Sequence, residues 1–327
     1  MLEISEPNIR DVFAAHREIS KYLPVTALYR YPSLSELLDC EVFVKHENHQ
    51  PTGAFKVRGQ INVISNLDER KRKNGVIMAS TGNDAQAIAY AAGLFGVRAT
   101  VVMPERANPV KTRNTENLGA KVIFHGDGFE GASEHAEELA SKDGLTFVHS
   151  ADNPPLIAGA ATVMLEVIEQ LASVDAVIAP VGGGALAAGV SIVAKWFDSK
   201  VRTIGVQSSE SPAAYFSWKE RKVITKDRNS TIAEGLACGS AYELPQKILW
   251  RLLDNFVLVS DEEILAGMKM MIKNTRNLVE PSSAATLSAA IKMKEELRGK
   301  KVVLLLTGCN ATEEQILRAL SSQETNP

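Results

Sequence analysis

Short apolar runs alternate with longer amphipathic or alanine-rich stretches along most of the chain. An uninterrupted run such as Val-Val-Leu-Leu-Leu at 302–306 predicts a strand buried on both faces, and apolar positions three and four apart predict a helix packed on it. Because single helices separate the strands, neighbouring strands are expected to be parallel, with right-handed crossovers. The predicted strands cover 41–45, 75–79, 99–103, 121–124, 176–179, 201–206, 257–259 and 301–306, and the predicted helices cover 8–21, a stretch opening near residue 56, 84–95, 108–118, 131–141, 161–171, 186–197, 242–256, 262–276 and 283–297.

This order of elements predicts an α/β protein with two doubly wound open-sheet lobes. A chain of 327 residues is long enough for two lobes that each bury a core. Ligands of such lobes bind beyond the carboxyl ends of the strands. Loops that lead from a strand into a helix are therefore where the chemistry is expected.

Composition narrows the class of protein. Hydrophobic residues make up 45% and charged residues 23%, and the net charge of −3 gives no electrostatic reason to expect a nucleic acid or an anionic membrane as partner. The first residues carry acids and no run reaches the ~18 apolar residues of a membrane span, so neither a signal peptide nor a span is expected. Cys40, Cys238 and Cys309 are odd in number and far apart, which favours a reducing compartment. We predict a cytoplasmic protein.

The stretch Glu47-Asn-His-Gln-Pro-Thr-Gly-Ala-Phe-Lys-Val-Arg-Gly59 joins a predicted strand to a predicted helix through a turn at Pro51 and Gly53. It places Lys56 in the first turn of the helix, where the positive end of the helix dipole favours the neutral amine. The neutral amine is the form that condenses with an aldehyde. An ordinary solvated lysine is the alternative, and the rest of the chain decides between the two.

Two strand-to-helix loops have the composition of anion sites. Ser80-Thr-Gly-Asn-Asp84 opens a helix whose free N–H groups can bind a carboxylate or phosphate, although a plain Ser/Thr/Asn helix cap explains the same residues. Val181-Gly-Gly-Gly-Ala-Leu186 has three consecutive glycines, which cost conformational entropy unless the backbone wraps an anion. This loop is neither Gly-x-Gly-x-x-Gly nor a P-loop, which argues against dinucleotides and nucleoside triphosphates. We predict a phosphate cup there.

Two more loops add polar groups at the same edge. Thr307 follows the most apolar strand, where its hydroxyl could bond a ring nitrogen, and Glu280 precedes a helix start at Pro281. Turn and cap residues are ordinary in both places. Together with Lys56 and the glycine loop, however, they complete a site for pyridoxal 5′-phosphate and an amino acid, with a Schiff-base lysine, a phosphate cup, a ring-nitrogen partner and a carboxylate site.

Six motifs carry a resemblance that covers nearly the whole length. They are Lys45-His-Glu-Asn-His-Gln-Pro-Thr-Gly-Ala-Phe-Lys-Val-Arg-Gly59, Ser80-Thr-Gly-Asn83, Pro180-Val-Gly-Gly-Gly184, Thr231-Ile-Ala-Glu-Gly-Leu-Ala237, Val279-Glu-Pro-Ser282 and Thr307-Gly-Cys-Asn310. In this order they resemble the fold-type II pyridoxal-phosphate enzymes, and within them the serine/threonine dehydratase and serine racemase family. The resemblance implies a tryptophan synthase β-like fold, in which a small lobe of 48–148 is inserted into a large lobe made of 1–47 and 149–327.

The resemblance also implies a role for each site residue. Lys56 would form the Schiff base with pyridoxal 5′-phosphate and move the α-proton of the substrate. Phe55 and Asn83 would contact the cofactor ring and its O3′, and Gly235 would line the other side of the ring. Thr307 would face the pyridine nitrogen, with Glu280 near the same edge. The phosphate would be cradled by Gly182, Gly183, Gly184 and Ala185, and the substrate would be held by Ser80, Thr81, Gly82, Asn83 and Asp84.

The implied activity is dehydration and deamination of L-serine, L-threonine or a related 3-hydroxy amino acid, which gives an α-keto acid and ammonia. A neutral Thr307 leaves the pyridine nitrogen largely unprotonated, and we expect this to favour rapid β-elimination. A serine racemase, with Thr81 reprotonating the opposite face, and another β-eliminating lyase are the alternatives. A non-catalytic cofactor- or amino-acid-binding protein would have no need of Lys56. A Rossmann dehydrogenase is also disfavoured, because this chain lacks Gly-x-Gly-x-x-Gly after an early strand.

Several positions depart from the family pattern. Ala54 stands where a serine is usual, Ala185 stands where a fourth glycine is common, and Asp84 replaces the usual histidine. We expect the negative charge of Asp84 to disfavour substrates with a second carboxylate. The loop after 201–206 keeps only Glu210 of the acids that bind a cation in some relatives, so no metal site is predicted. Relatives are usually dimers or larger, and a homo-oligomer is expected.

Overall fold

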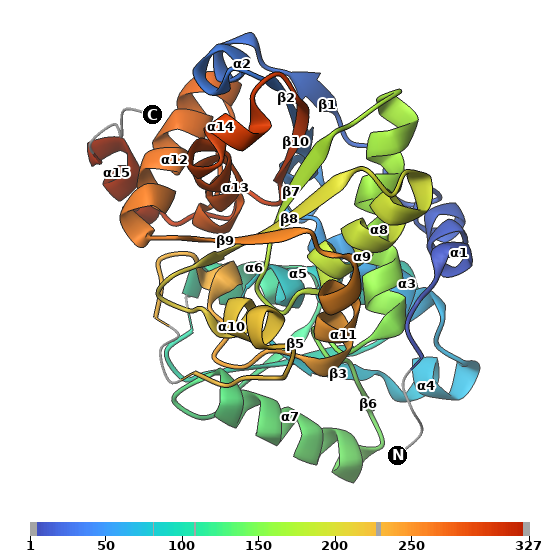
Figure 1. Ribbon diagram of the computed structural model, residues 1–327. Coiled ribbons are helices and arrows are strands. Elements are labelled where there is room, and N and C mark those ends of the chain that lie inside the picture. The colour runs from blue at the N-terminus through green and yellow to red at the C-terminus, as the bar shows by residue number, and fades with distance from the viewer. Residues whose placement is uncertain (1–4, 81, 108, 227–229, 323–327) are drawn as a thin grey trace.

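The computed structural model describes residues 5–80, 82–107, 109–226 and 230–322. Its strands form two separate sheets, each wrapped by helices, as Figure 1 shows. The prediction of a doubly wound α/β architecture is confirmed.

The larger sheet has six strands in the order β1-β2-β10-β7-β8-β9. Its neighbouring strands are parallel except at the edge, where β1 runs antiparallel to β2. Side chains alternate between the two faces, so that Val303 and Leu305 face one core while Val302 and Leu304 face the other. The strands are β1 (Leu28–Arg30), β2 (Glu41–His46), β7 (Ala176–Pro180), β8 (Arg202–Ser208), β9 (Asn255–Val259) and β10 (Lys301–Leu306).

Helices cover both faces of the larger sheet. The core of Val303 and Leu305 includes apolar residues of a first group of helices, and the core of Val302 and Leu304 includes those of a second group. The first group is α1 (Ile9–Ile19), α8 (Pro154–Gln170), α9 (Ala185–Phe197) and α11 (Glu243–Leu252), and the second is α2 (Pro32–Leu38), α12 (Asp261–Thr275), α13 (Pro281–Lys292), α14 (Lys294–Leu297) and α15 (Glu313–Ser321).

The smaller sheet has four parallel strands in the order β5-β4-β3-β6. Helix α7 packs on one face, where Ala132 and Ala136 meet Ile77, and α5 lies on the face that carries Met78. The elements are β3 (Val76–Ala79), β4 (Ala99–Met103), β5 (Lys121–Phe124), β6 (Thr146–Phe147), α4 (Glu69–Asn74), α5 (Asn83–Leu94), α6 (Pro109–Asn117) and α7 (Phe129–Asp143).

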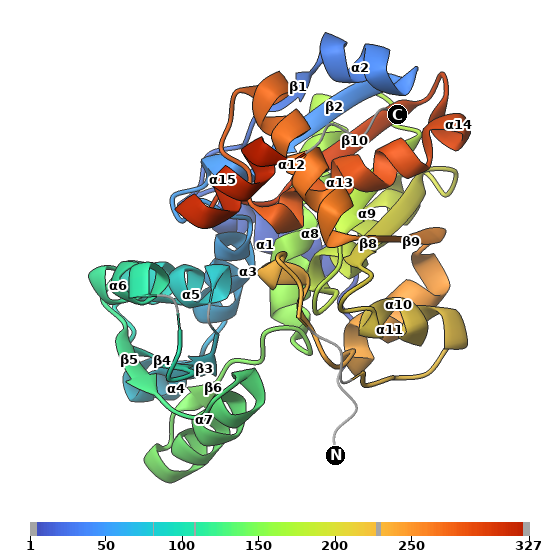
Figure 2. The same ribbon diagram turned by 90° about the vertical axis from the view of Figure 1, so that its left-hand side faces the viewer.

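Helix α3 (Lys56–Ser65) lies between the two sheets and packs against both α5 and α8. Figure 2 shows it between the β3–β6 group and the rest of the molecule. Its buried Val57 and Ile61 belong to one apolar core that reaches from the smaller sheet to the α8 side of the larger one. The lobe boundaries at 48 and 148 stay a prediction.

Several element ends differ from those predicted, and local chemistry explains them. Helix α8 begins at Pro154 instead of 161 because the side chain of Asn153 accepts the N–H of Leu156 and caps it. Strand β9 already begins at Asn255. The pattern did not predict β1, α2, α4, β6, α15 or the helix α10 (Ala213–Glu220). No helix within the described ranges is both long and apolar enough to cross a membrane.

Candidate active site

Lys56 is the first residue of α3, as predicted, and its side chain points at the start of another helix. Its Nζ lies 2.7 Å from Oδ2 of Asp84, the second residue of α5. Oδ1 of Asp84 accepts a hydrogen bond of 2.8 Å from Nε2 of Gln60, one turn along α3. The carboxylate is 6% exposed and the lysine 28%. A buried carboxylate therefore faces the amine, and the sequence did not predict this pairing.

The turn before Lys56 is fastened to the loop that follows β10. The N–H of Phe55 donates to the carbonyl of Thr307, and the N–H of Cys309 donates to the carbonyl of Gly53, both at 2.9 Å. The Phe55 ring centroid lies 5.6 Å from Lys56 Nζ. Because two segments far apart in sequence are bonded here, Thr307 and Lys56 belong to one site.

Thr307 is buried and its hydroxyl lies 2.9 Å from the hydroxyl of Ser283 on α13. The N–H of Gly308 donates to the same Ser283 oxygen at 2.8 Å. Ser283 therefore holds the Thr307 loop in place. The predicted role of Thr307 toward a pyridine nitrogen stays a prediction.

Asn83, Glu280 and Asn310 form a closed polar triangle. Nδ2 of Asn83 lies 3.0 and 2.9 Å from the two Glu280 oxygens, and Oδ1 of Asn83 accepts from Nδ2 of Asn310 at 2.8 Å. Burial raises the pKa of Glu280, and the hydrogen bond from Asn83 opposes that shift. The orientation of the Asn83 amide is thus set by Glu280. The sequence predicts only that Glu280 lies near the same edge of the site as Thr307.

The glycine loop between β7 and α9 forms a tight cup. A Cβ on Gly182 would clash with the carbonyl oxygen of Gly235, and one on Gly183 would lie 2.9 Å from Cβ of Ala151. Gly184 has φ of +92°, a conformation that L side chains resist, and caps the helix that begins at Ala185. Within the described part of the chain, no acceptor pairs with the N–H groups of 182–185. Such N–H groups at a helix start bind anions.

The predicted carboxylate loop lies directly before α5. Ser80 Oγ accepts from the N–H groups of Gly82 and Ala85 at 3.3 and 3.2 Å, so part of its role is that of a helix cap. A Cβ on Gly82 would meet nothing within 4 Å among the described residues, so the loop borders open space. Thr81 lies outside the described residues.

Cys238 lies beside the glycine cup, where the charge of Lys56 acts on its thiol. Its Sγ lies 3.6 Å from the Cβ position of Gly182, and the nearby Lys56 charge opposes the burial that raises the pKa of its thiol to about 11. Tyr242, four positions later, packs against Gly183, and burial raises the pKa of its hydroxyl. Neither residue is predicted as part of the site from the sequence, although both follow closely on the Thr231–Ala237 motif.

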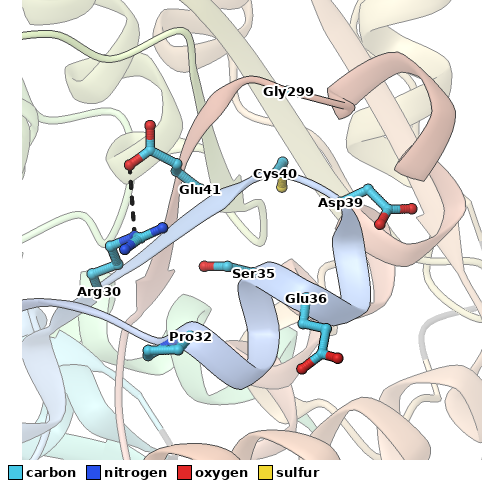
Figure 3. A pocket seen from close by; sticks show the side chains of 8 residues that line it. All are labelled: Arg30, Pro32, Ser35, Glu36, Asp39, Cys40, Glu41 and Gly299. Atoms are coloured by element: carbon cyan, nitrogen blue, oxygen red, sulfur yellow. Dashed lines mark ion pairs between the residues drawn. The ribbon is translucent and has the colours of Figure 1, made fainter.

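Another hollow of about 430 Å³ lies at the opposite, amino-terminal edge of the larger sheet (Figure 3). Arg30 and Glu41 form an ion pair of 3.6 Å on its rim. It contains none of the predicted site residues. Among the described residues, no three His, Cys, Asp or Glu side chains gather as a metal site.

Comparison with known proteins identifies the family. The family model described as "Pyridoxal-phosphate dependent enzyme" matches residues 19–308. The chain is a pyridoxal-phosphate dependent enzyme. It is 36% identical to the L-threonine ammonia-lyase of Thermotoga maritima over 313 residues, which are 96% of this chain and 78% of the relative.

Solved structures agree with this assignment. Maize serine racemase superimposes on the enzyme with a TM-score of 0.92 at 29% identity, covering 97% of each chain. The processed form of threonine deaminase isoform 2 from Solanum lycopersicum superimposes with a TM-score of 0.90 at 29% identity, covering 99% of this chain and 98% of that one. The enzyme therefore has the fold of the fold-type II pyridoxal-phosphate enzymes.

The residues present fit the cofactor of this family, pyridoxal 5′-phosphate. Lys56 offers the amine for its aldehyde, and the N–H groups of the glycine cup, which have no acceptor among the described residues, suit its phosphate. The close approach of Gly235 to Gly182 leaves no room for a side chain in the cup. The Lys56 charge acts on Cys238, and the Sγ of Cys238 lies 3.6 Å from the Cβ position of Gly182, so the amine and the cup belong to one site.

Proposed function

We propose that the enzyme removes water and then ammonia from L-serine, L-threonine or a related 3-hydroxy amino acid, and so releases an α-keto acid and ammonia. The observation that carries the proposal is that Lys56 contacts Asp84 at the start of α5 while its charge also acts on Cys238, whose Sγ lies 3.6 Å from the Cβ position of Gly182 in the glycine cup. A basic amine there reaches both cofactor and substrate. Similarity to an L-threonine ammonia-lyase supports the same reaction.

In this proposal each side chain has a separate task. When bound, pyridoxal 5′-phosphate supplies an electron sink for the substrate α-carbon. Lys56 takes the α-proton as general base, and the helix-start loop with Ser80, Gly82 and Asn83 holds the substrate carboxylate. Glu280 fixes the Asn83 amide toward the site. We assign Phe55, Thr307, Gly235 and 182–185 to the cofactor, as the resemblance implies.

A racemase is the second candidate, and the match to maize serine racemase favours it. It would need an acid on the face of the substrate opposite Lys56, a task proposed for Thr81. A β-branched hydroxyl has restricted rotamers, and we rank this activity below elimination for that reason.

The test is release of α-keto acid and ammonia from a panel of 3-hydroxy amino acids by the wild type, by Lys56→Ala and by Lys219→Ala. Lys219 lies on α10, outside the site, and serves as the matched control. We expect keto acid from the wild type and the control and none from Lys56→Ala. The same samples are analysed for D-amino acids by chiral chromatography. Formation of a D-amino acid without keto acid would replace the lyase with the racemase.

We further propose that the enzyme is cytoplasmic and forms a homodimer or larger homo-oligomer. Its three cysteines are all unpaired, as in proteins of a reducing compartment. Val25, Tyr29 and Leu278 are more than half exposed and would be covered by a second copy. Light scattering gives the mass in solution, and a monomer at micromolar concentration would contradict the oligomer.

A further inference from the structure

The carboxylate of Asp84 faces the lysine that the reaction needs. Its two oxygens have different partners, because Oδ1 is held by Gln60 at 2.8 Å and Oδ2 meets Lys56 Nζ at 2.7 Å. The side chain is only 6% exposed, so water has little access to this contact. One oxygen is therefore fixed in orientation while the other is in reach of any proton that the lysine carries.

We propose that Asp84 carries the proton from Lys56 to the departing hydroxyl group. The proposal rests on the proposed function, since only a substrate with a hydroxyl at the β-carbon needs this step. It makes Asp84 a second catalytic residue, and it explains why a carboxylate stands where related enzymes have a histidine.

The step balances in protons and electrons. Lys56 takes the α-proton, and the electron pair of the broken C–H bond becomes the π bond between the α- and β-carbons. The lysine ammonium passes one proton to Oδ2 of Asp84, breaking an N–H bond and forming an O–H bond. As the β-carbon–oxygen bond breaks with its electron pair on oxygen, that proton joins the oxygen and water leaves. Lys56 ends as a neutral amine and Asp84 as a carboxylate.

Other titratable groups near the site are poorly suited to this task. Glu280 is bound by Asn83 and by the N–H of Asn310, and Glu234 is paired with Lys111. Burial raises the pKa of the Cys238 thiol to about 11, and it also raises that of the Tyr242 hydroxyl, so that both keep their protons.

The charge of Asp84 also acts on His149. Its Nδ1 accepts the N–H groups of Ala151 and Asp152 at 3.1 and 2.8 Å, and burial lowers its pKa. It is therefore neutral and its Nδ1 is occupied. Of the described residues, Asp84 is the acid in direct contact with Lys56 Nζ.

The experiment compares two leaving groups on the holoenzyme. Water needs a proton to leave, whereas chloride from 3-chloro-L-alanine does not. We expect Asp84→Asn to slow elimination from the best 3-hydroxy amino acid by about 10²- to 10⁴-fold, the usual contribution of a general acid, and to slow chloride release far less. Asp84→His, which restores a proton carrier, is expected to recover part of the lost rate.

A second readout uses the apoprotein. An amine reagent followed by mass spectrometry reports the rate of acylation of Lys56, with Lys219 as the internal control. In Asp84→Asn the carboxylate that contacts Lys56 Nζ is removed, and we therefore expect Lys56 to react several-fold faster than in the wild type. An unchanged rate would show that the pair does not form and would overturn the relay.

The outcomes separate the relay from the proposed function. Equal losses for water and chloride in Asp84→Asn, or no loss for either, would overturn the relay alone, provided the wild type dehydrates the hydroxy substrate. A wild type that releases chloride but dehydrates no hydroxy amino acid would overturn the proposed function, and the relay with it.

Discussion

His46, at the end of β2, is a fully buried imidazole between two polar neighbours. Its Nε2 lies 2.9 Å from the Tyr31 hydroxyl, and its Nδ1 lies 3.1 Å from Oδ1 of Asn48. Asn48 donates its amide to Asn277, so its Oδ1 is free to accept from Nδ1 of a neutral imidazole. Burial lowers the pKa of His46 to about 4.

This histidine makes stability depend on pH. Below pH 6.5 the unfolded chain binds a proton that the folded protein excludes, so stability falls as pH drops from 6.5 toward 4. Between pH 7.5 and 5 the wild type is expected to lose about 2 kcal/mol more than His46→Gln in urea unfolding. His16→Gln, on α1, serves as the control and should keep the wild-type slope. Equal slopes for wild type and His46→Gln would refute the prediction.

Residue types could be predicted from the sequence, but some of their partners could not. Lys56 lies in the first turn of a helix, as the strand, turn and helix pattern around it predicts, and its role toward the cofactor stays a prediction. Asp84 was predicted to help hold the substrate and to disfavour a second carboxylate, and the structure places it in the first turn of α5. Its contact with Lys56 depends on how α5 packs against α3, and no local pattern encodes that arrangement.

Three elements are joined by a buried network of charges. Arg58 of α3 donates to Glu47 at 2.7 Å and to Glu166 of α8 at 2.6 Å, and Lys45 of β2 donates to Glu166 at 2.6 Å. Although burial alone would raise the pKa of Glu166, Arg58 and Lys45 hold it below its usual range. The positive charges of Arg58 and Lys45 balance the negative charges of Glu47 and Glu166. The network fixes the first turn of the helix that carries Lys56.

Removing one charge from this network should be costly. Lys45→Met leaves an unbalanced buried carboxylate and is expected to lower the free energy of unfolding by about 3–5 kcal/mol. Adding Glu166→Gln restores balance between Arg58 and Glu47, so the double variant should lose clearly less than the two single losses added together. Urea unfolding measures all three, with the exposed Lys21→Met as control. Strict additivity would contradict the coupling.

The predictable elements are those with a long or strongly apolar pattern. The runs that became β3, β4 and β10 are buried on both faces, and their composition alone indicates this. Short elements were missed because they have few buried residues of their own. Helix α4 buries none, and β1 is held mainly by its pairing with β2. Such elements depend on neighbours distant in sequence.

At the scale of the whole molecule, an ion pair joins the two sheet systems. Lys111 on α6, beside the smaller sheet, pairs with Glu234 of the 3-10 helix Glu234–Leu236 beside the larger one. Lys111 is nearly buried, and both charges act on Glu280 in the site. The pair forms only when the two sheet systems lie close together around the site.

We expect Glu234→Gln to raise the KM for substrate by about two- to fivefold with little change in kcat, because the Lys111–Glu234 pair holds the two sheet systems together around the site. The difference should shrink in 0.5 M salt, which screens exposed charges. Steady-state kinetics at low and high salt measures both effects, with Glu220→Gln on α10 as control. A KM unchanged at low salt would contradict the role of the pair.

The order of the strands in the two sheets also determines which part of the protein can fold first during synthesis. The smaller sheet uses only strands between Val76 and Phe147, so its chain is complete early. In the larger sheet, β2 lies beside β10, which follows all the other described strands along the chain. The turn before Lys56 bonds to the loop after β10 and must wait for the same segment. The smaller sheet can therefore fold while later parts of the chain are still being synthesised. The site around Lys56 can assemble only after β10 has left the ribosome.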